Sequence, residues 1–306
     1  MNRDKKTPAQ SSRQQHGNSS TPLTEDGSTL IIRPHRSWLS IDWHGLWEYR
    51  DMLRFLIIRD FVSKYKQTVL GPAWFVIQPL FMTLVFTVIF GKVAGISTDG
   101  LPQTLFYLSG LLGWNYFAQT FLATSSNLIV NANLFRKVYF PRIIVPASVT
   151  ISNLIAFTIQ LITFGAFWIY FKYFTEAANT FAFSPWAWLF PVLVLQTGAL
   201  SLGIGLWMSA LAAKYRDLHN VSNFIIQAWM YITPVIYPLS SIPEHWRWVV
   251  NLNPMTTVVE SYRLLFLGQG TLDSGLMVQS AVITIFVLLS GVIVYNRIQR
   301  NFVDYS

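Results

Sequence analysis

The residue types that most often carry out chemistry form few recognisable patterns in this chain. Cysteine is absent, which excludes disulfides, thiolate metal ligands and a cysteine nucleophile. The sequence has no Gly-x-x-x-x-Gly-Lys-Ser/Thr loop to cradle ATP phosphates. It also has no Gly-x-Ser-x-Gly motif and no histidine pair at metal-ligand spacing. We therefore predict no catalytic residue, no metal site and no cofactor within the chain itself.

Polar residues that could still form a site occur in the segment 238–272. Within it, Asn253 followed by Pro254 is a helix cap followed by a favoured first helical residue. The segment therefore predicts two short helices, near 243–251 and 254–266. Because both stretches are rich in apolar side chains, we expect them to be re-entrant and partly buried.

Four ionisable side chains of this segment could act on a substrate. Glu260 and Arg263 stand three residues apart, so they can form a pair on one face of the second helix, which we expect to be partly exposed. Together with Glu244 and His245, they could instead serve a membrane-embedded transferase that acts on a lipid-linked sugar at the outer face. The sequence leaves this enzymatic alternative open.

The elements that would position these residues are membrane spans. Of the 306 residues, 52% are apolar and 12% are charged, whereas about a quarter of an ordinary soluble domain is charged. Six windows of 23 to 37 residues contain no Asp, Glu, Lys or Arg, and each exceeds the roughly 20 residues that cross a bilayer. We expect transmembrane helices near 72–91, 104–124, 143–171, 186–212, 220–238 and 276–296.

The chain is thus predicted to be an all-α integral membrane protein with a six-span domain at 72–306. Residues 1–30 lack the apolar core of a signal peptide and are predicted to be a disordered cytoplasmic tail, followed by an interface segment at 31–71. On this topology, 18 of the 22 Lys and Arg residues share the side of the termini, which places both termini in the cytoplasm. This bias accounts for the net charge of +8, and no nucleic-acid partner is expected.

Residues 46–66 form a basic, amphipathic stretch before the first predicted span. Its apolar residues recur at helical spacing: Leu46, Leu53, Ile57, Phe61 and Tyr65. Its basic residues are Arg50, Arg54, Arg59, Lys64 and Lys66. Such a helix lies in the cytoplasmic headgroup plane, either as an anchor or as a cradle for an anionic lipid headgroup. After it, Gly71 and Pro72 let the chain turn into the bilayer.

The predicted cytoplasmic loop 125–142 carries many apolar side chains. They are Ile129, Leu134, Phe135, Val138 and Phe140, and they lie beside Arg136 and Lys137. Exposed apolar groups of this kind indicate a docking surface for a soluble partner. The alternative is a loop that lies on the membrane surface.

The predicted spans contain no Asp, Glu, Lys or Arg. This disfavours an ion-coupled flippase, because such carriers place ionisable groups within the membrane. The spans carry aromatic and amide side chains instead, most of which fit interfacial belts. A minority could line a conduit, where rings stack on sugars and amides bond hydroxyls. The candidates for pore lining are Tyr107, Trp114, Asn115, Phe117, Tyr231 and Tyr237.

An ordered set of short motifs resembles the ABC-2-type polysaccharide export permeases, which include O-antigen exporters. The motifs are Arg59-Asp60, Tyr65 through Trp74, Gln78-Pro79-Leu80, Gly110-Leu111 through Trp114, Asn133 through Arg142, Tyr215-Arg216-Asp217, Pro234 through Pro238 with Ile242-Pro243, and Asn253-Pro254-Met255 followed by Arg263. Any one of them alone would be a weak signal, whereas the ordered combination is specific.

The resemblance implies a function that composition could not supply. Family members are similar in forming one half of a homodimeric channel that exports lipid-linked polysaccharide, such as O-antigen, capsule or teichoic-acid precursors, across the bacterial cytoplasmic membrane. A separate ATPase subunit binds the ATP and Mg, which agrees with the missing P-loop.

The resemblance also implies roles for the segments described above. It implies an interface helix at 46–66 whose basic residues collect the substrate headgroup, and a lateral-gate loop at Leu70 and Gly71. The outer gate would be 243–266, with Asn253, Pro254, Glu260 and Arg263. The coupling helix at 129–140 would contact the ATPase through Asn133, Leu134, Phe135, Arg136, Lys137 and Tyr139.

Overall fold

The computed structural model describes residues 47–64, 66, 68–137, 140–215, 217–270 and 273–302. Within these residues every regular element is helical and there is no strand, so the all-α prediction is confirmed for this part of the chain. The predicted tail at 1–30 and the first part of the interface segment lie outside the described residues, as do Leu46, Tyr65 and Tyr139.

Four helical stretches are long and apolar enough to cross a membrane, and they coincide with four of the six predicted spans. The first is Gly71–Val93, which comprises a 3-10 turn (Gly71–Ala73), α3 (Trp74–Phe86) and a π-helical end (Thr87–Val93). The others are α7 (Ile144–Phe174), the turn Pro185–Leu189 with α8 (Phe190–Lys214), and the greater part of α12 (Ser274–Phe302).

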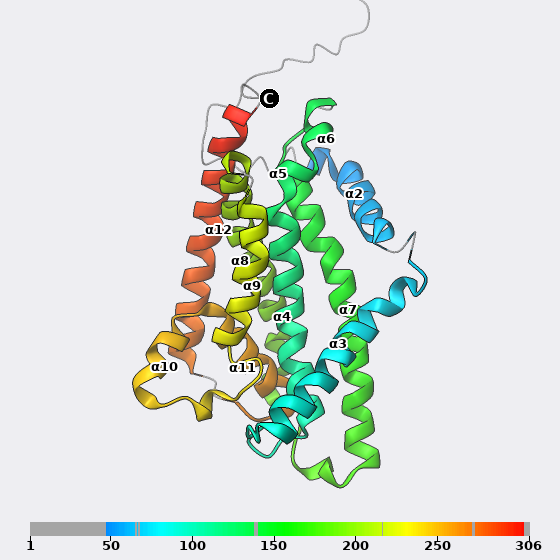
Figure 1. The fold of residues 1–306 in the computed structure, drawn as a ribbon, viewed down its shortest axis with the longest axis vertical. Helices are drawn as coiled ribbons and strands as arrows, with labels where there is room; N and C mark the ends of the chain where they lie inside the picture. Colours follow the sequence, from blue (N-terminus) through cyan, green and yellow to red (C-terminus); the bar gives the residue numbers. More distant parts are fainter. Residues whose placement is uncertain are drawn as a thin grey trace, which may run out of the picture. The chain divides into compact units, whose positions relative to one another are not determined.

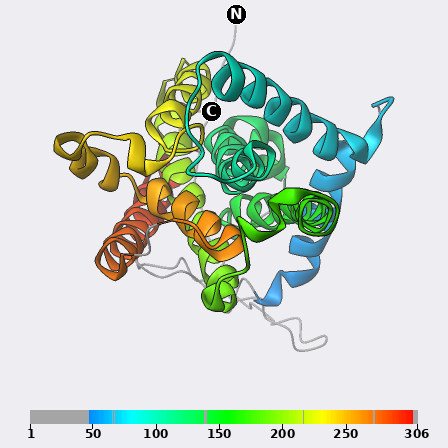
Figure 2. The same ribbon diagram turned by 90° about the horizontal axis from the view of Figure 1, so that it is seen from below.

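The remaining two predicted spans coincide with helices that do not meet the same criteria. The first is α4 (Gln103–Ser125), which is long enough but is interrupted by polar and small residues. It lies in the middle of the bundle, where it contacts α3, α7, α8, α9 and α11 (Figure 2). Because protein surrounds it, with 16 of its 23 residues buried, its polar side chains need not face lipid. The second is α9 (Leu218–Ile232), which has only 15 residues.

The pair formed by α8 and α12 is packed closely through glycines. A Cβ atom added to Gly203 on α8 would lie 2.8 Å from the Cα atom of Leu288 on α12. Gly291 on α12 faces the backbone of Gly203 in return. Small residues at such a crossing let two helix backbones approach, which is a typical way of joining helices within a membrane.

Short helices lie at both ends of the bundle (Figure 1). Near the end where α12 finishes are α2 (Arg50–Ser63), α5 (Asn127–Val130) and α6 (Ala132–Lys137). Toward the opposite end are α10 (Glu244–Asn251) and α11 (Pro254–Leu267), which occupy the two stretches predicted to be short helices. The 3-10 turns Glu176–Asn179 and Leu239–Ser241 complete the described elements.

The helix α2 carries apolar side chains beyond the predicted stripe as well as within it. Its buried residue is Leu56, which packs with Ile144 and Val145 at the start of α7. Phe55 and Ile58 are largely exposed. Of the predicted stripe, Leu53 packs against the same cluster, and Ile57 and Phe61 are half-buried.

Candidate functional site

The helix α11 is held by the cap that the sequence predicts. The Oδ1 atom of Asn253 accepts a hydrogen bond from the backbone N–H of Met255 at 3.1 Å, and its Nδ2 atom donates to Oγ1 of Thr233 at 2.9 Å. Pro254 occupies the first turn. The helix ends at Gly268, whose φ of 70° is a left-handed conformation that favours glycine. The Asn253 side chain thus joins the start of α11 to the segment that follows α9.

Arg263 crosses from α11 to two other parts of the chain. Its Nη1 atom donates to Oε1 of Glu260 at 2.8 Å, and its Nη2 atom donates to the backbone oxygen of Val235 at 2.8 Å. The guanidinium carbon lies 3.7 Å from the ring centroid of Phe106 on α4. A Cβ atom on Gly110 would lie 3.1 Å from Nη2, so glycine at that position makes room for the cation.

The Glu260–Arg263 pair is buried, and the expectation of a partly exposed pair is wrong. The exposed fractions of the two side chains are 7% and 1%. Burial lowers the pKa of the Arg263 guanidinium, and the neighbouring Glu260 carboxylate opposes this effect. Removing one partner of a buried pair costs about 3–5 kcal/mol, because the other charge is left without compensation. Disrupting this pair should therefore cost much more than disrupting a surface ion pair.

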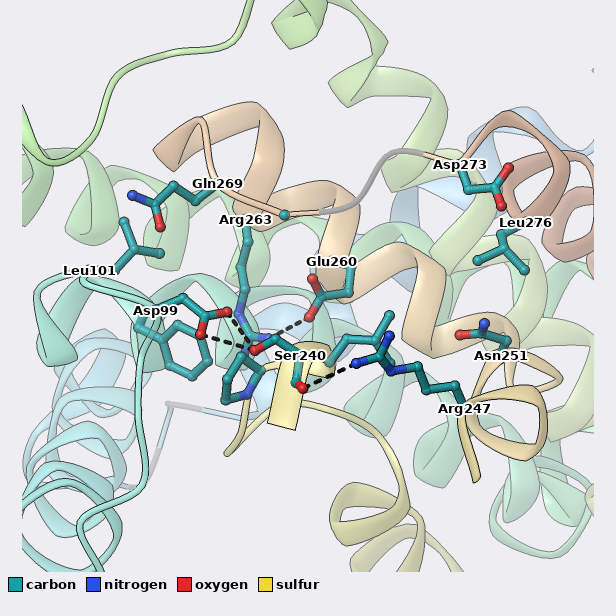
Figure 3. Close-up of a pocket in the computed structure, with 14 residues that line it drawn as sticks. Asp99, Leu101, Ser240, Arg247, Asn251, Glu260, Arg263, Gln269, Asp273 and Leu276 are labelled. Atoms are coloured by element: carbon teal, nitrogen blue, oxygen red, sulfur yellow. Dashed lines mark hydrogen bonds and ion pairs between the residues drawn. The ribbon is translucent and has the colours of Figure 1, made fainter. Parts of the chain in front are cut away.

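A pocket of about 430 Å³ opens beside this pair (Figure 3). Its walls come from the α3–α4 loop, α4, the α9–α10 loop, α10, α11, the α11–α12 connection and the start of α12. The polar lining residues are Asp99, Ser240, Arg247, Asn251, Glu260, Arg263, Gln269 and Asp273, and the apolar ones include Leu101, Phe106 and Leu276. Eight of its fourteen lining residues are thus polar or charged, and apolar residues supply the rest of the lining.

The pocket brings together only two of the four residues that the transferase alternative requires. Glu260 and Arg263 line it, whereas Glu244 and His245 are exposed on α10 and are not among its lining residues. The pocket residues that sequence reasoning missed include Asp99, Ser240 and Asn251, which come from separate segments. An Asp99-Gly100 pair indicates a turn, but no sequence pattern indicates that Ser240 donates to both carboxylate oxygens of Asp99, at 2.9 and 2.8 Å.

The basic residues predicted to form a headgroup cradle do not share one environment. Arg50 and Lys66 are exposed. Arg54 lies 3.9 Å from Asp51, and both side chains are highly exposed. Arg59 forms a 2.8 Å pair with Asp60.

Lys64 points toward the bundle instead. Although much of its side chain is exposed, its ammonium donates to Oδ1 of Asn153 on α7 at 2.5 Å. Asn153 is buried and donates in turn to Oγ1 of Thr120 on α4 at 3.2 Å. Burial lowers the pKa of Lys64, and the carboxylate of Asp60 opposes this effect. The end of α2 is therefore tied to α7 and α4 through polar groups.

The loop predicted to couple to an ATPase forms α5 and α6, and its apolar residues are divided between core and surface. Leu134 and Phe135 pack against the core beneath α2, and Phe140 is 5% exposed. Val130 is 70% exposed and Ile129 is 41% exposed. The expectation that the whole apolar set faces water is thus wrong for Leu134, Phe135 and Phe140. Val138 lies outside the described residues.

The surface of α6 also bears two of the residues predicted to contact the ATPase. Asn133 and Lys137 are exposed. The side chain of Arg136 and the whole of Tyr139 lie outside the described residues. Behind this surface, Arg59 of α2 donates to Oδ1 of Asn131 at 3.5 Å, so α2 and the α5–α6 connection are in direct contact.

Leu70 and Gly71 connect α2 to the first span. Leu70 is 45% exposed. Gly71 has a φ of 52°, and no atom lies within 4 Å of an added Cβ. Glycine is therefore required here by backbone conformation and not by space.

The candidates for pore lining separate into buried and exposed groups. Tyr107, Trp114 and Phe117 of α4 are at most 4% exposed and pack against other rings, for example Phe117 on Trp229 at 5.3 Å. The half-buried candidates are Asn115, which donates to Gln160 at 3.4 Å, and Tyr237, whose hydroxyl donates to backbone oxygens of 231 and 232. Tyr231 is 59% exposed. Their role in a conduit stays a prediction.

Four helical stretches with the length and composition of membrane spans, together with a capped pair of short helices, are the features of an integral membrane protein. Residues 52–267 match the ABC-2 type transporter family, and the chain belongs to this family.

Individual named proteins are similar to this chain over most of its length. The chain is 27% identical over 255 residues to the O-antigen export system permease protein RfbA of Klebsiella pneumoniae, covering 83% of this chain and 94% of the relative. It is 26% identical over 268 residues to the protein of the same name from Myxococcus xanthus, covering 85% and 96%. It is 23% identical over 244 residues to the polysialic acid transport protein KpsM of Escherichia coli, covering 79% and 91%.

Proposed function

We propose that this chain is the permease subunit of an ATP-driven exporter that moves lipid-linked polysaccharide across the bacterial cytoplasmic membrane. The observation that carries the proposal is the similarity over most of the chain to permeases named for O-antigen export and polysialic acid transport. Membership of the ABC-2 type transporter family supports the ATP-driven class. The sequence contains no P-loop, so ATP and Mg belong to a separate ATPase subunit.

The proposal includes six spans with both termini in the cytoplasm. The helix α4 has 23 residues, and at 1.5 Å per residue it reaches about 35 Å, enough to cross a hydrocarbon core of about 30 Å. The 15 residues of α9 reach only about 22 Å, so the span is completed by residues 233–238. The end of the bundle with α6 then faces the cytoplasm, in keeping with the distribution of Lys and Arg.

The same topology assigns a place to each candidate segment. The exposed Val130, Asn133 and Lys137 would contact the ATPase. Arg50 and Lys66 would face the anionic leaflet and the substrate headgroup. Leu70 and Gly71 would form the lateral gate, while α10 and α11 would form a re-entrant gate at the outer face. Two copies of the chain would enclose the conduit.

A cell-based export assay tests this proposal. The chain is deleted from its native host and then restored on a plasmid, and polysaccharide is measured at the cell surface and inside the cell. We expect deletion to leave the lipid-linked polysaccharide on the cytoplasmic side of the membrane. Restoration should return it to the cell surface. Unchanged surface polysaccharide after deletion would contradict the proposal.

A further inference from the structure

The polar pocket beside Arg263 is suited to a ligand rich in hydroxyl groups. Ligand pockets commonly enclose roughly 300–1,000 Å³, and this one encloses about 430 Å³. Three carboxylates line it, from Asp99, Glu260 and Asp273, together with the amides of Asn251 and Gln269. Carboxylates accept hydrogen bonds from hydroxyls, and amides both donate and accept. We propose that the pocket binds neutral pyranose residues of a glycan.

The charge balance of the lining disfavours an anionic ligand. The three carboxylates outnumber the two guanidinium groups, those of Arg247 and Arg263. Both cations are also engaged within the protein. Arg247 donates to the backbone oxygens of Ile242 and Ser240 at 2.9 and 3.3 Å, and Arg263 pairs with Glu260. A phosphate or uronate in the pocket would therefore meet excess negative charge with little free positive charge to offset it.

Two buried polar atoms of the lining have no hydrogen-bond partner among the described protein atoms. They are Oδ1 of Asn251 and Nε of Arg263, and the Arg263 side chain is 1% exposed. An unpaired buried polar group is costly, so a ligand hydroxyl that reached either atom would be favoured. A ligand with several hydroxyls could both donate to Asn251 and accept from Arg263.

The backbone at the rim of the pocket is also unusual. Among the described residues, Asp99 is the only non-glycine with a positive φ, at 52°. Non-glycine residues in this conformation are uncommon and cluster at functional sites. Here the conformation accompanies the contact between the Asp99 carboxylate and the Ser240 hydroxyl across the pocket (Figure 3). A sugar hydroxyl can take the place of the Ser240 hydroxyl with the same chemistry.

The position of the pocket connects it with export. It lies at the end of the bundle opposite α6, where α10 and α11 meet the loops around it (Figures 1 and 3). On the proposed function, on which this part of the inference rests, that end is the exit, and the ligand is a sugar unit of the emerging polysaccharide. The chemistry would also suit a free sugar, so binding and export are measured separately.

The binding test uses the purified full chain in lipid nanodiscs and saturation-transfer NMR. The probes are the methyl glycosides of glucose, galactose and mannose, with methyl glucuronide as the anionic comparison. A single pyranoside should bind with a dissociation constant on the order of millimolar. We expect at least one neutral glycoside to bind more tightly than the glucuronide. Absence of binding by all three, or preference for the glucuronide, would overturn the inference.

Variants of the lining residues test whether the glycosides bind in the pocket. Asp273→Asn is conservative, because the Asp273 side chain is exposed and an amide oxygen can still accept from the backbone N–H of Gly275. Asn251→Leu removes the unpaired amide oxygen. Each should weaken glycoside binding roughly fivefold to tenfold, the range expected when a charged acceptor becomes neutral or a hydrogen bond to an amide is lost. Glu244→Gln on α10, outside the pocket, is the matched control and should bind as the unchanged protein does. Equal affinity in all four proteins would overturn the inference.

Export separates this inference from the function on which it rests. Normal export by the unchanged chain without glycoside binding would refute the sugar pocket alone. Deletion of the chain could instead leave surface polysaccharide unchanged while Asp273→Asn abolishes glycoside binding. The proposed export function would then be refuted, and the sugar pocket would belong to a transporter of another substrate. If the exported glycan is the ligand, Asp273→Asn should also slow export of long chains, whereas a site for free sugars predicts normal export.

Discussion

Replacing Arg263 by Met should destabilise the protein far more than the same change at a surface arginine. The variant keeps a long side chain of similar reach but removes the charge. It leaves the Glu260 carboxylate buried, and it leaves the backbone oxygen of Val235 without the 2.8 Å donor that it has in the structure. Breaking one side of a buried pair costs about 3–5 kcal/mol, and the lost contact with the Phe106 ring adds to this cost.

The chain supplies a close control in Arg54. It also lies three residues from a carboxylate, that of Asp51, but at 3.9 Å and with exposed fractions of 76% and 80% for the two side chains. Such a pair contributes about 0–1 kcal/mol, so Arg54→Met should have little effect. Residue type, substitution and sequence spacing are the same in the two variants, so the difference between them reports the burial of Arg263 and the contacts that accompany it.

Thermal unfolding in nanodiscs provides the measurement. Arg263→Met should lower the melting temperature by roughly 6 °C or more, using the 2–4 °C per kcal/mol typical of domains of 150–250 residues. The double variant Glu260→Gln with Arg263→Met should be less destabilised than Arg263→Met alone, since no buried charge remains. Equal melting temperatures for the Arg263 and Arg54 variants would refute the reasoning, as would a double variant that is less stable than both single ones.

Three further predictions concern the two ends of the bundle. Val130→Asp, at a 70% exposed position, should reduce ATPase co-purification without lowering the melting temperature. Phe135→Ser should lower the melting temperature, because Phe135 packs in the core. The proposed docking surface would be contradicted if Val130→Asp lowered the melting temperature and Phe135→Ser reduced only the co-purification. Because burial lowers the pKa of Lys64, NMR of reductively methylated protein should show this lysine titrating below 10.5. The stability of the folded state should then rise with pH between the pKa of the folded state and 10.5, because the unfolded chain binds more protons in that range. Titration at or above 10.5 would contradict the dominance of burial over the opposing Asp60 carboxylate. Single cysteines that replace the exposed Trp246 and Trp248 should react with a water-soluble thiol reagent. Cysteines that replace the buried Val258 and Val259 should be protected unless ATP turnover opens the gate. Uniform labelling that is independent of turnover would contradict a gate.

The sequence predicted the helices well where one physical rule decides the outcome. Long windows without charge must be helical if they enter a membrane, and four of them coincide with helices that meet the length and composition of a span. The cap at Asn253 could also be predicted, because capping depends on residues that are neighbours in the chain.

The tertiary contacts could not be predicted in the same way. The spacing of Glu260 and Arg263 indicates a pair, but it contains no information about the Val235 and Phe106 contacts that bury it. The contact from Lys64 to Asn153 joins residues 89 positions apart. The pocket residues Asp99 and Ser240 are 141 positions apart. Such sites depend on which helices lie side by side, and periodicity within one helix does not determine that arrangement.

The central claim is that this chain forms the path of an ATP-driven polysaccharide exporter. Reconstitution with its co-purifying ATPase in proteoliposomes tests it most directly, with lipid-linked polysaccharide supplied on the ATPase side and detected on the other side by an added lectin or glycosidase. We predict that polysaccharide reaches the far side only with ATP and Mg, and that transport is lost when the ATPase is omitted. ATP hydrolysis without any movement of polysaccharide, or movement that is independent of ATP, would contradict the claim.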